Sequence, residues 1–118
     1  MEILATNKEL TKEEIYYLTK SQDVQKMTEA VDSTVDVLAW AIYTDKDKDG
    51  NEVELFSMLT DDGVSYATNS QTFISAFRDI MDIFDPEEIK RLKIFNGTSK
   101  NNRTFITCAY VSPMRDIE

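Results

Sequence analysis

The sequence of 118 residues contains no histidine and a single cysteine, Cys108. Zinc sites and Cys–His nucleophiles need imidazoles or several thiolates, so neither can be built from this chain. One cysteine also cannot form an internal disulfide, which fits a reducing compartment. Cys108 lies within a β-rich run, and we expect it to be a core residue. No feature of the sequence supports catalysis, a metal site or a cofactor.

Glycine is also scarce. Only three glycines are present, and they form no glycine-rich phosphate-binding loop. The sequence lacks an apolar run long enough for a transmembrane helix. Residues 1–7 have neither a basic start nor an apolar signal core, so we expect a cytoplasmic protein rather than a secreted one. With 42% hydrophobic residues, a chain of this length is expected to form one domain with a substantial core.

Charge is distributed unevenly along the chain. The net charge is −9, but residues 90–115 contain six basic residues and no Asp or Glu, a balance of +6. Residues 1–89 carry −13, and the last three residues carry −2. The six basic residues are Lys90, Arg91, Lys93, Lys100, Arg103 and Arg115. The overall negative charge argues against general binding to duplex DNA or to an anionic membrane, but a local basic groove is compatible with it.

The basic segment also contains Phe95, Phe105 and Tyr110. Proteins bind single-stranded nucleic acids through cations that contact phosphates and through ring faces on which unstacked bases stack. The segment therefore predicts a site for a single strand. The structural alternative is a basic hairpin that balances the charge of an acidic body.

Two regions have helical patterns. Thr11 and Glu14 form a capping box at the start of a short helix, and a weaker helical spacing continues to about residue 31. Ser70 opens the clearest helix, whose apolar residues form one stripe before Pro86 stops it.

Five β-rich runs with alternating apolar residues are interpreted as strands. They cover residues 35–44, 53–60, 64–68, 92–95 and 104–111. Three strands, a helix and two strands is the order of an OB-fold, a small five-stranded Greek-key barrel, so we expect a mainly β protein. The alternatives are an open α+β sheet with one covering helix and an SH3-like barrel with an inserted helix.

The chain is expected to divide near residue 31. Residues 1–31 would form an N-terminal helical segment packed on the barrel, and residues 32–118 would form the OB-like barrel itself.

Residues 45–50, between two expected strands, resemble the start of a calcium-binding loop. Position 12 of that loop is Phe56 instead of the required glutamate, so we interpret the segment as a hairpin turn.

Every expected strand carries an aromatic residue, and most aromatic residues on strands are core. By parity, Trp40 and Tyr43 face opposite sides of their strand, as do Phe105 and Tyr110. Both members of such a pair cannot be core unless a bulge intervenes. Some of these rings are therefore candidates for a binding surface.

Several motifs follow one another in a set order from residue 62 onward. Residues 62–72 contain an Asp-Gly turn and an aromatic strand, the amphipathic helix follows, and residues 94–105 contain Gly-Thr-Ser with a basic residue. This ordered set resembles the small single-stranded-DNA-binding proteins of tailed phages that infect Gram-positive bacteria. Residues 5–11 are also similar to phage sequences of this group. The sequence departs from the family pattern at residues 101–102, two asparagines where relatives often have a turn glycine.

The resemblance implies a non-enzymatic protein that coats and protects single-stranded DNA, without sequence preference, during phage DNA replication. It implies an OB-like barrel in the cytoplasm of the bacterial host. The candidates for phosphate contacts are Lys100, Arg103 and Lys93. The candidates for base stacking are Tyr66, Phe95, Phe105 and Trp40.

Single-stranded DNA is thus the expected partner, with replication proteins as further partners, no membrane, and either a monomer or a dimer. A function of another class also fits the acidic residues 1–89. An acidic phage protein-interaction module, or a DNA mimic, could bind a host factor through them, and the basic cluster would then be structural.

Overall fold

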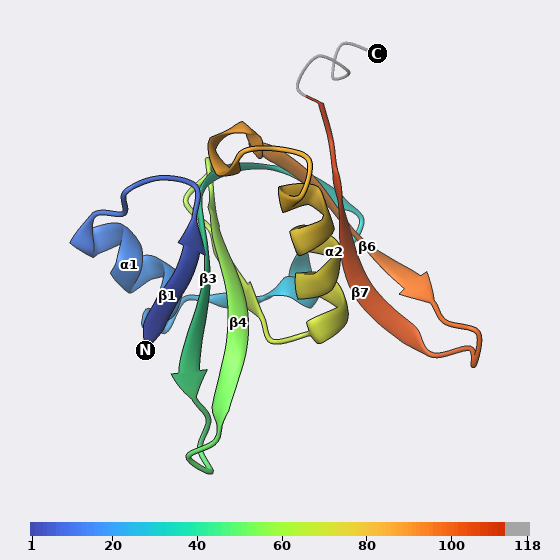
Figure 1. Ribbon diagram of the computed structural model, residues 1–118, viewed down its shortest axis with the longest axis horizontal. Coiled ribbons are helices and arrows are strands. Elements are labelled where there is room, and N and C mark those ends of the chain that lie inside the picture. Colours follow the sequence, from blue (N-terminus) through green and yellow to red (C-terminus); the bar gives the residue numbers. More distant parts are fainter. Residues whose placement is uncertain (113–118) are drawn as a thin grey trace.

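The computed structural model describes residues 1–112 as a mainly β protein whose sheet curls into half a barrel (Figure 1). The strands are β1 (Glu2–Thr6), β2 (Gln25–Lys26), β3 (Ser33–Lys46), β4 (Glu52–Thr60), β5 (Ser65–Thr68), β6 (Arg91–Thr98) and β7 (Thr104–Tyr110). The helices are α1 (Lys12–Thr19) and α2 (Gln71–Met81), with short 3₁₀ turns η1 (Met27–Ala30) and η2 (Pro86–Glu88). None of the helices within residues 1–112 is long and apolar enough to cross a membrane.

β3 is the strand around which the sheet is built. It pairs antiparallel with β4 through residues 37–46, with β6 through residues 33–36 and with β1 through residues 41–44. The path of the sheet is β2-β5-β4-β3-β6-β7, and β1 is attached to β3 beside this path. Because successive stretches of β3 pair with different strands, the sheet curls as it follows β3.

A β-bulge interrupts β3 between Val37 and Ala39. The bulge shifts the alternation of side chains by one residue, so the main core receives Val37 before it and Trp40 after it. Leu38, at the bulge, is exposed. The side chain of Asn7 braces this point, because its amide donates to the Leu38 carbonyl at 3.0 Å and accepts from the Trp40 N–H at 3.0 Å.

The main core lies between the inner face of the sheet and α2. Trp40 packs edge to face on Phe77 with ring centres 4.7 Å apart, and Phe56 lies 4.5 Å from the same ring. The Ser70 hydroxyl caps α2 by accepting from the Phe73 N–H at 3.2 Å. The predicted cap and the predicted burial of the apolar stripe are confirmed.

α2 ends at Met81, earlier than the apolar stripe suggested. Phe84, the last residue of that stripe, leaves the helix and stacks on Tyr110 of β7 with ring centres 3.9 Å apart. Pro86 then starts η2. The Phe84 N–H still donates to the Ile80 carbonyl at 3.0 Å, so the chain turns out of the helix at this residue and the ring contact ties it to β7.

A second, smaller core lies on the opposite face of β3 and β4, beneath α1. Leu18 of α1 is fully buried in it together with Tyr43. Trp40 and Tyr43 are therefore both buried on opposite faces of one strand, so the prediction that one of them must be outside a core is wrong. The reason is that α1 covers the face that a one-sided sheet leaves open. The predicted capping box holds α1, with Thr11 and Glu14 each accepting from the other's N–H, at 3.1 and 2.9 Å.

The N-terminal part differs from the expected helical segment. Residues 1–31 contain α1 and also β1 and β2, so the predicted total of five strands is wrong and the described residues form seven. β2 pairs in parallel with Tyr66 and Ala67 of β5, where the spacing had suggested helix. Both additional strands depend on partners far along the chain, and such pairing leaves little trace in local periodicity.

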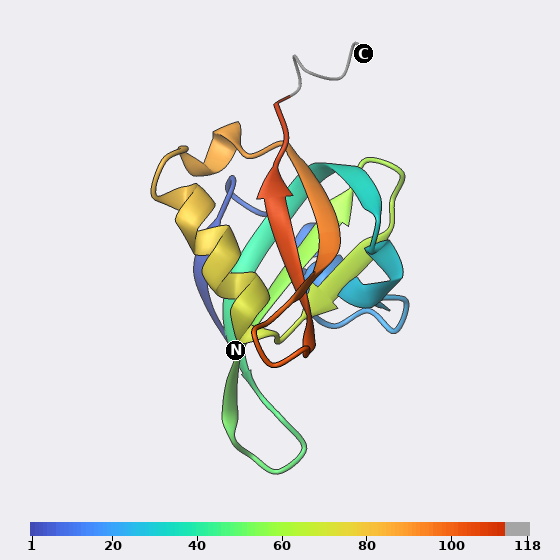
Figure 2. The same ribbon diagram turned by 90° about the vertical axis from the view of Figure 1, so that its right-hand side faces the viewer.

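The two ends of the sheet do not meet. β2 and β7 are the ends of the path, and no pairing closes the barrel within residues 1–112. α2 packs against β7 and lies along the inside of the curl, and the β6–β7 hairpin extends away from the body (Figures 1 and 2). The predicted order of three strands, a helix and two strands is present as β3, β4, β5, α2, β6 and β7.

Leu18→Ala is expected to lower the free energy of unfolding by about 2–5 kcal/mol, the range for truncating a buried leucine, because Leu18 anchors α1 to the sheet. Tyr16→Ala removes a ring of the same helix that is 52% exposed, and a change below about 1 kcal/mol is expected. Urea unfolding followed by Trp40 fluorescence measures both. Equal losses for the two variants would contradict the second core.

Candidate nucleic-acid interface

The β6–β7 hairpin has one face in the main core and one face outside it. Leu92 and Ile94 of β6 and Cys108 of β7 are on the inner face and are buried. Burial raises the pKa of the Cys108 thiol to about 12, so the predicted core role of this cysteine is confirmed. Phe95 and Phe105 lie on the outer face, because side chains alternate along a strand. Among the described residues, neither ring packs into the main core or the second core.

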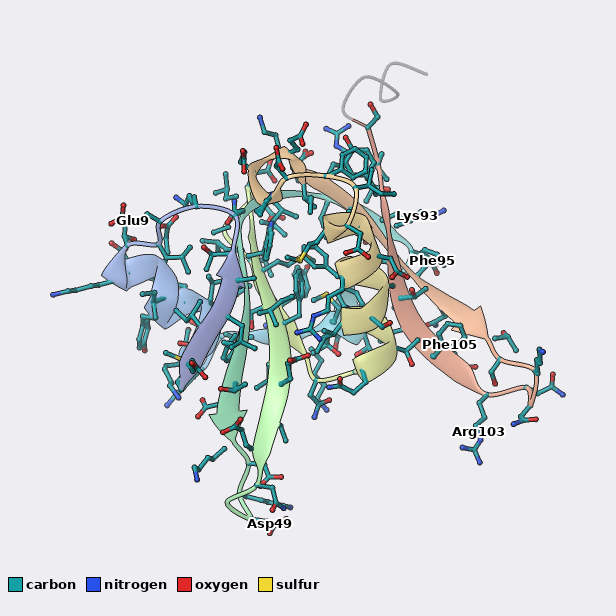
Figure 3. All side chains as sticks on the ribbon, in the orientation of Figure 1. Glu9, Asp49, Lys93, Phe95, Arg103 and Phe105 are labelled. Atoms are coloured by element: carbon teal, nitrogen blue, oxygen red, sulfur yellow. The ribbon has the colours of Figure 1, made fainter. Side chains whose placement is uncertain are left out.

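Three predicted site residues share this outer face. Lys93 and Phe95 follow one another on the same side of β6, and the Lys93 ammonium is 5.9 Å from the centre of the Phe95 ring. Phe105 lies on β7 directly across from Gly97. Lys93 is exposed and both rings are partly exposed, and Figure 3 shows Lys93 and Phe95 on the side of the hairpin away from α2. The face thus offers rings to bases and a cation to a phosphate.

The tip of the hairpin carries two more predicted cations, Lys100 and Arg103, both exposed. The Ser99 N–H donates to the Arg103 carbonyl at 2.9 Å, and the Arg103 N–H donates to the Ser99 hydroxyl at 3.2 Å. Asn102 has a φ of 60°, a left-handed conformation that asparagine adopts more readily than most residues. It therefore meets the backbone requirement for which the resembling proteins often use glycine. Figure 3 shows Arg103 extending from this tip.

Three cations in the acidic part of the chain are bound to carboxylates. The pairs are Lys8–Glu14 at 2.5 Å, Lys20–Asp45 at 2.6 Å and Arg78–Glu54 at 2.9 Å. The hydrogen bonds from Lys8 and Lys20 hold the pKa of Glu14 and of Asp45 below the usual range. Figure 3 places the acidic residues Glu9 and Asp49 away from the β6–β7 hairpin. Three of the seven cations in residues 1–89 are therefore neutralised by a neighbouring carboxylate.

In the β6–β7 hairpin, one of the four cations is paired with a carboxylate, and the other three form no ion pair within residues 1–112. Arg91 at its base pairs with Asp36 of β3 at 2.6 Å, so this residue fits the structural alternative. Arg115 lies outside the described residues. The cations of the hairpin that form no ion pair within residues 1–112 are Lys93, Lys100 and Arg103. The hairpin has no acidic residue of its own, and its positive charge is available to a ligand.

The other two stacking candidates lie elsewhere. Trp40 is fully buried, so the structure places it in the main core and not on a surface. Tyr66 of β5 is paired with Met58, and its ring packs against the main core, partly buried. Tyr66 is thus on the inner face and in a strand remote from β7 along the sheet path. The structure does not bring it together with Phe95 and Phe105.

Gly97 was not among the predicted site residues, yet it lies within the outer face. A β-carbon built on Gly97 would overlap the Phe105 ring. The signal in the sequence was a glycine in the interior of a strand, which weakens the strand unless another group approaches closely.

No group of three or more His, Cys, Asp or Glu side chains in the described part of the chain is placed to hold a metal ion.

Comparison with known proteins agrees with the resemblance seen in the sequence. A family model described as phage single-stranded DNA-binding protein matches residues 11–110. The matched stretch runs from the cap of α1 to the end of β7 and includes the whole hairpin. Among curated proteins and among solved structures, none matches the chain.

Asn102→Ala is expected to lower the free energy of unfolding by about 1 kcal/mol, because alanine is strained in the left-handed conformation. Asn102→Gly should leave stability unchanged or raise it slightly, since glycine has no such strain. Asn101→Ala is the matched control, and a change below about 0.5 kcal/mol is expected for it. If thermal unfolding shows the same loss for both alanine variants, the left-handed turn is not what Asn102 provides.

Proposed function

The chain belongs to the family of phage single-stranded DNA-binding proteins, and from this we propose that it binds single-stranded DNA in phage replication. In this proposal it coats and protects the strand without sequence preference. Proteins of the family are non-catalytic binders, and we propose the same for this chain. Its place would be the cytoplasm of the bacterial host, with replication proteins as further partners.

The outer face of the β6–β7 hairpin is the observation that carries the proposal. Its two rings, Phe95 and Phe105, pack into neither core of the described residues. The hairpin's cations Lys93, Lys100 and Arg103 form no ion pair within residues 1–112. Aromatic rings on strands are usually buried in a core, so two rings outside both cores indicate a role in binding. Stacking of unpaired bases on the rings, with phosphates at the cations, uses both features together.

The half-barrel is proposed to be a variant of the OB-fold. β3, β4 and β5 form three consecutive antiparallel strands, α2 follows, and β6 and β7 return to the first part of β3. In OB-folds the face of the second and third strands and the two hairpin loops bind oligonucleotides. Here α1 packs on that face of β3, β4 and β5. Of the two hairpin loops, the β3–β4 loop carries Asp47 and Asp49, whereas the β6–β7 hairpin has no acidic residue, so we assign binding to the β6–β7 hairpin.

Each predicted residue receives a role in this proposal. Lys93 near the base of the hairpin and Lys100 and Arg103 at its tip would contact phosphates. Phe95 and Phe105, side by side on the outer face, would each stack with a base. Tyr66 would be reached only by a strand that continues around to the inner face of the sheet, and Trp40 is left to the core.

Binding of fluorescently labelled oligo-dT, compared with a duplex of the same length by anisotropy, tests the proposal. We expect a strong preference for the single strand, because the basic face is small and the acidic remainder repels a stiff, doubly charged duplex. Equal affinity for both forms would overturn it. Binding to neither form would favour an acidic protein-interaction module or DNA mimic instead.

The salt dependence of oligo-dT binding should report the phosphate contacts. If Lys100 and Arg103 each contact one phosphate, changing both to alanine lowers the slope of log affinity against log salt by about 1.4, at about 0.7 per phosphate. The matched control is Lys8→Ala with Lys12→Ala, which removes two exposed cations near the start of α1, on the other side of the molecule from the hairpin (Figure 1), and should leave the slope unchanged. A slope that falls equally in both double variants would assign the effect to net charge.

A further inference from the structure

Gly97 lies in the interior of β6, where the backbone does not require glycine. The glycines with positive φ are Gly50 and Gly63, and both lie in turns. Inside a strand, glycine lowers stability because it loses more chain entropy on folding and packs no side chain. The reason for Gly97 must therefore lie in the space beside it.

The ring of Phe105 fills that space. The two residues are directly opposite in the register of β6 and β7. The three atoms nearest to a β-carbon built on Gly97 are all outer carbons of the Phe105 ring, and the position would overlap the ring. The ring thus lies across the hairpin on the backbone of β6 instead of standing away from β7. An aromatic ring that covers a glycine on the neighbouring strand is a known means of stabilising such pairs.

A ring held in this way is a stacking surface prepared before the ligand arrives. One side of the Phe105 ring is against β6, and the ring stays partly exposed. Phe95 lies two residues before Gly97 on the same outer face, so it is the diagonal neighbour of Phe105, at about 7 Å by strand geometry. Two rings therefore share one surface. Ordering a ring before binding reduces the entropy lost when a base stacks on it.

We propose that Gly97 is a positioning residue for base stacking. Its lack of a side chain lets the Phe105 ring lie on β6 and present one face to a base, next to the ring of Phe95. This inference rests on the proposed binding of single-stranded DNA. A β-carbon at position 97 would push the ring off the backbone and change the direction of its open face, without removing any group that touches DNA.

A double-mutant cycle on oligo-dT affinity tests the role of Gly97. Gly97→Ala is expected to weaken binding about tenfold, within the range for the loss of one stacked base. Phe105→Leu is expected to weaken it by a similar factor. In the Phe105→Leu background, Gly97→Ala should change affinity by less than about twofold, because the ring through which it acts is gone. Asn96→Ala, which alters the neighbouring side chain on the other face of β6, is the control and should leave affinity unchanged.

The outcomes separate this inference from the proposed function. If the unaltered protein does not bind oligo-dT, the proposed function fails. If it binds and Gly97→Ala binds equally well, or if the losses from Gly97→Ala and Phe105→Leu simply add, the positioning role is overturned. Melting temperatures of all four variants show whether a loss of affinity occurs in a folded protein.

NMR of the unaltered protein tests the same geometry even if Gly97→Ala does not fold. A ring face above Gly97 should shift its α-proton resonances upfield, and Phe105→Leu should abolish this shift. Addition of oligo-dT should then perturb the Gly97 and Phe105 resonances together. Gly97 resonances at ordinary positions, or unaffected by oligo-dT when the protein binds it, would overturn the inference.

Discussion

The pairing of one long strand, β3, with three others is the constraint on which the rest of the structure depends. The bulge between Val37 and Ala39 lets the strand change direction and still supply residues to both of its faces. α2 covers the inner face and α1 covers the outer face, so each helix is held by the same strand from opposite sides. Because residues 39–43 of β3 are buried on both faces, this stretch of the strand offers no free surface to a ligand.

The β6–β7 hairpin is held to this framework only by its base and its inner face. β6 pairs with the first residues of β3, and Leu92 and Ile94 contribute to the main core. The outer face contributes no residue to either core of the described residues, although the Phe105 ring packs across the hairpin on Gly97. In the proposed function, stability and binding are assigned to opposite faces of the same two strands, so the hairpin carries Phe95 and Phe105 without weakening the core.

Charge follows the same division. Three of the seven cations in residues 1–89 are bound to nearby carboxylates, and Arg91 at the base of the hairpin is bound to Asp36. Beyond Arg91, all charged residues of the hairpin are basic. In the proposed function, this acidic body with one basic arm is expected to disfavour a stiff duplex and to admit a flexible strand locally. The arm is thus the part of the molecule whose charge is complementary to a phosphate backbone.

The sequence by itself determined the elements that depend on near neighbours. The capping box of Thr11, the stripe of α2 and the alternation of five of the strands follow from residues a few positions apart, and so does the basic, aromatic character of residues 90–115. The tertiary structure decided the rest. It buried Trp40, turned Tyr66 inward, added β1 and β2, and set Phe105 on Gly97. Each of these depends on partners in other strands or helices, and local periodicity does not report which face another element will cover.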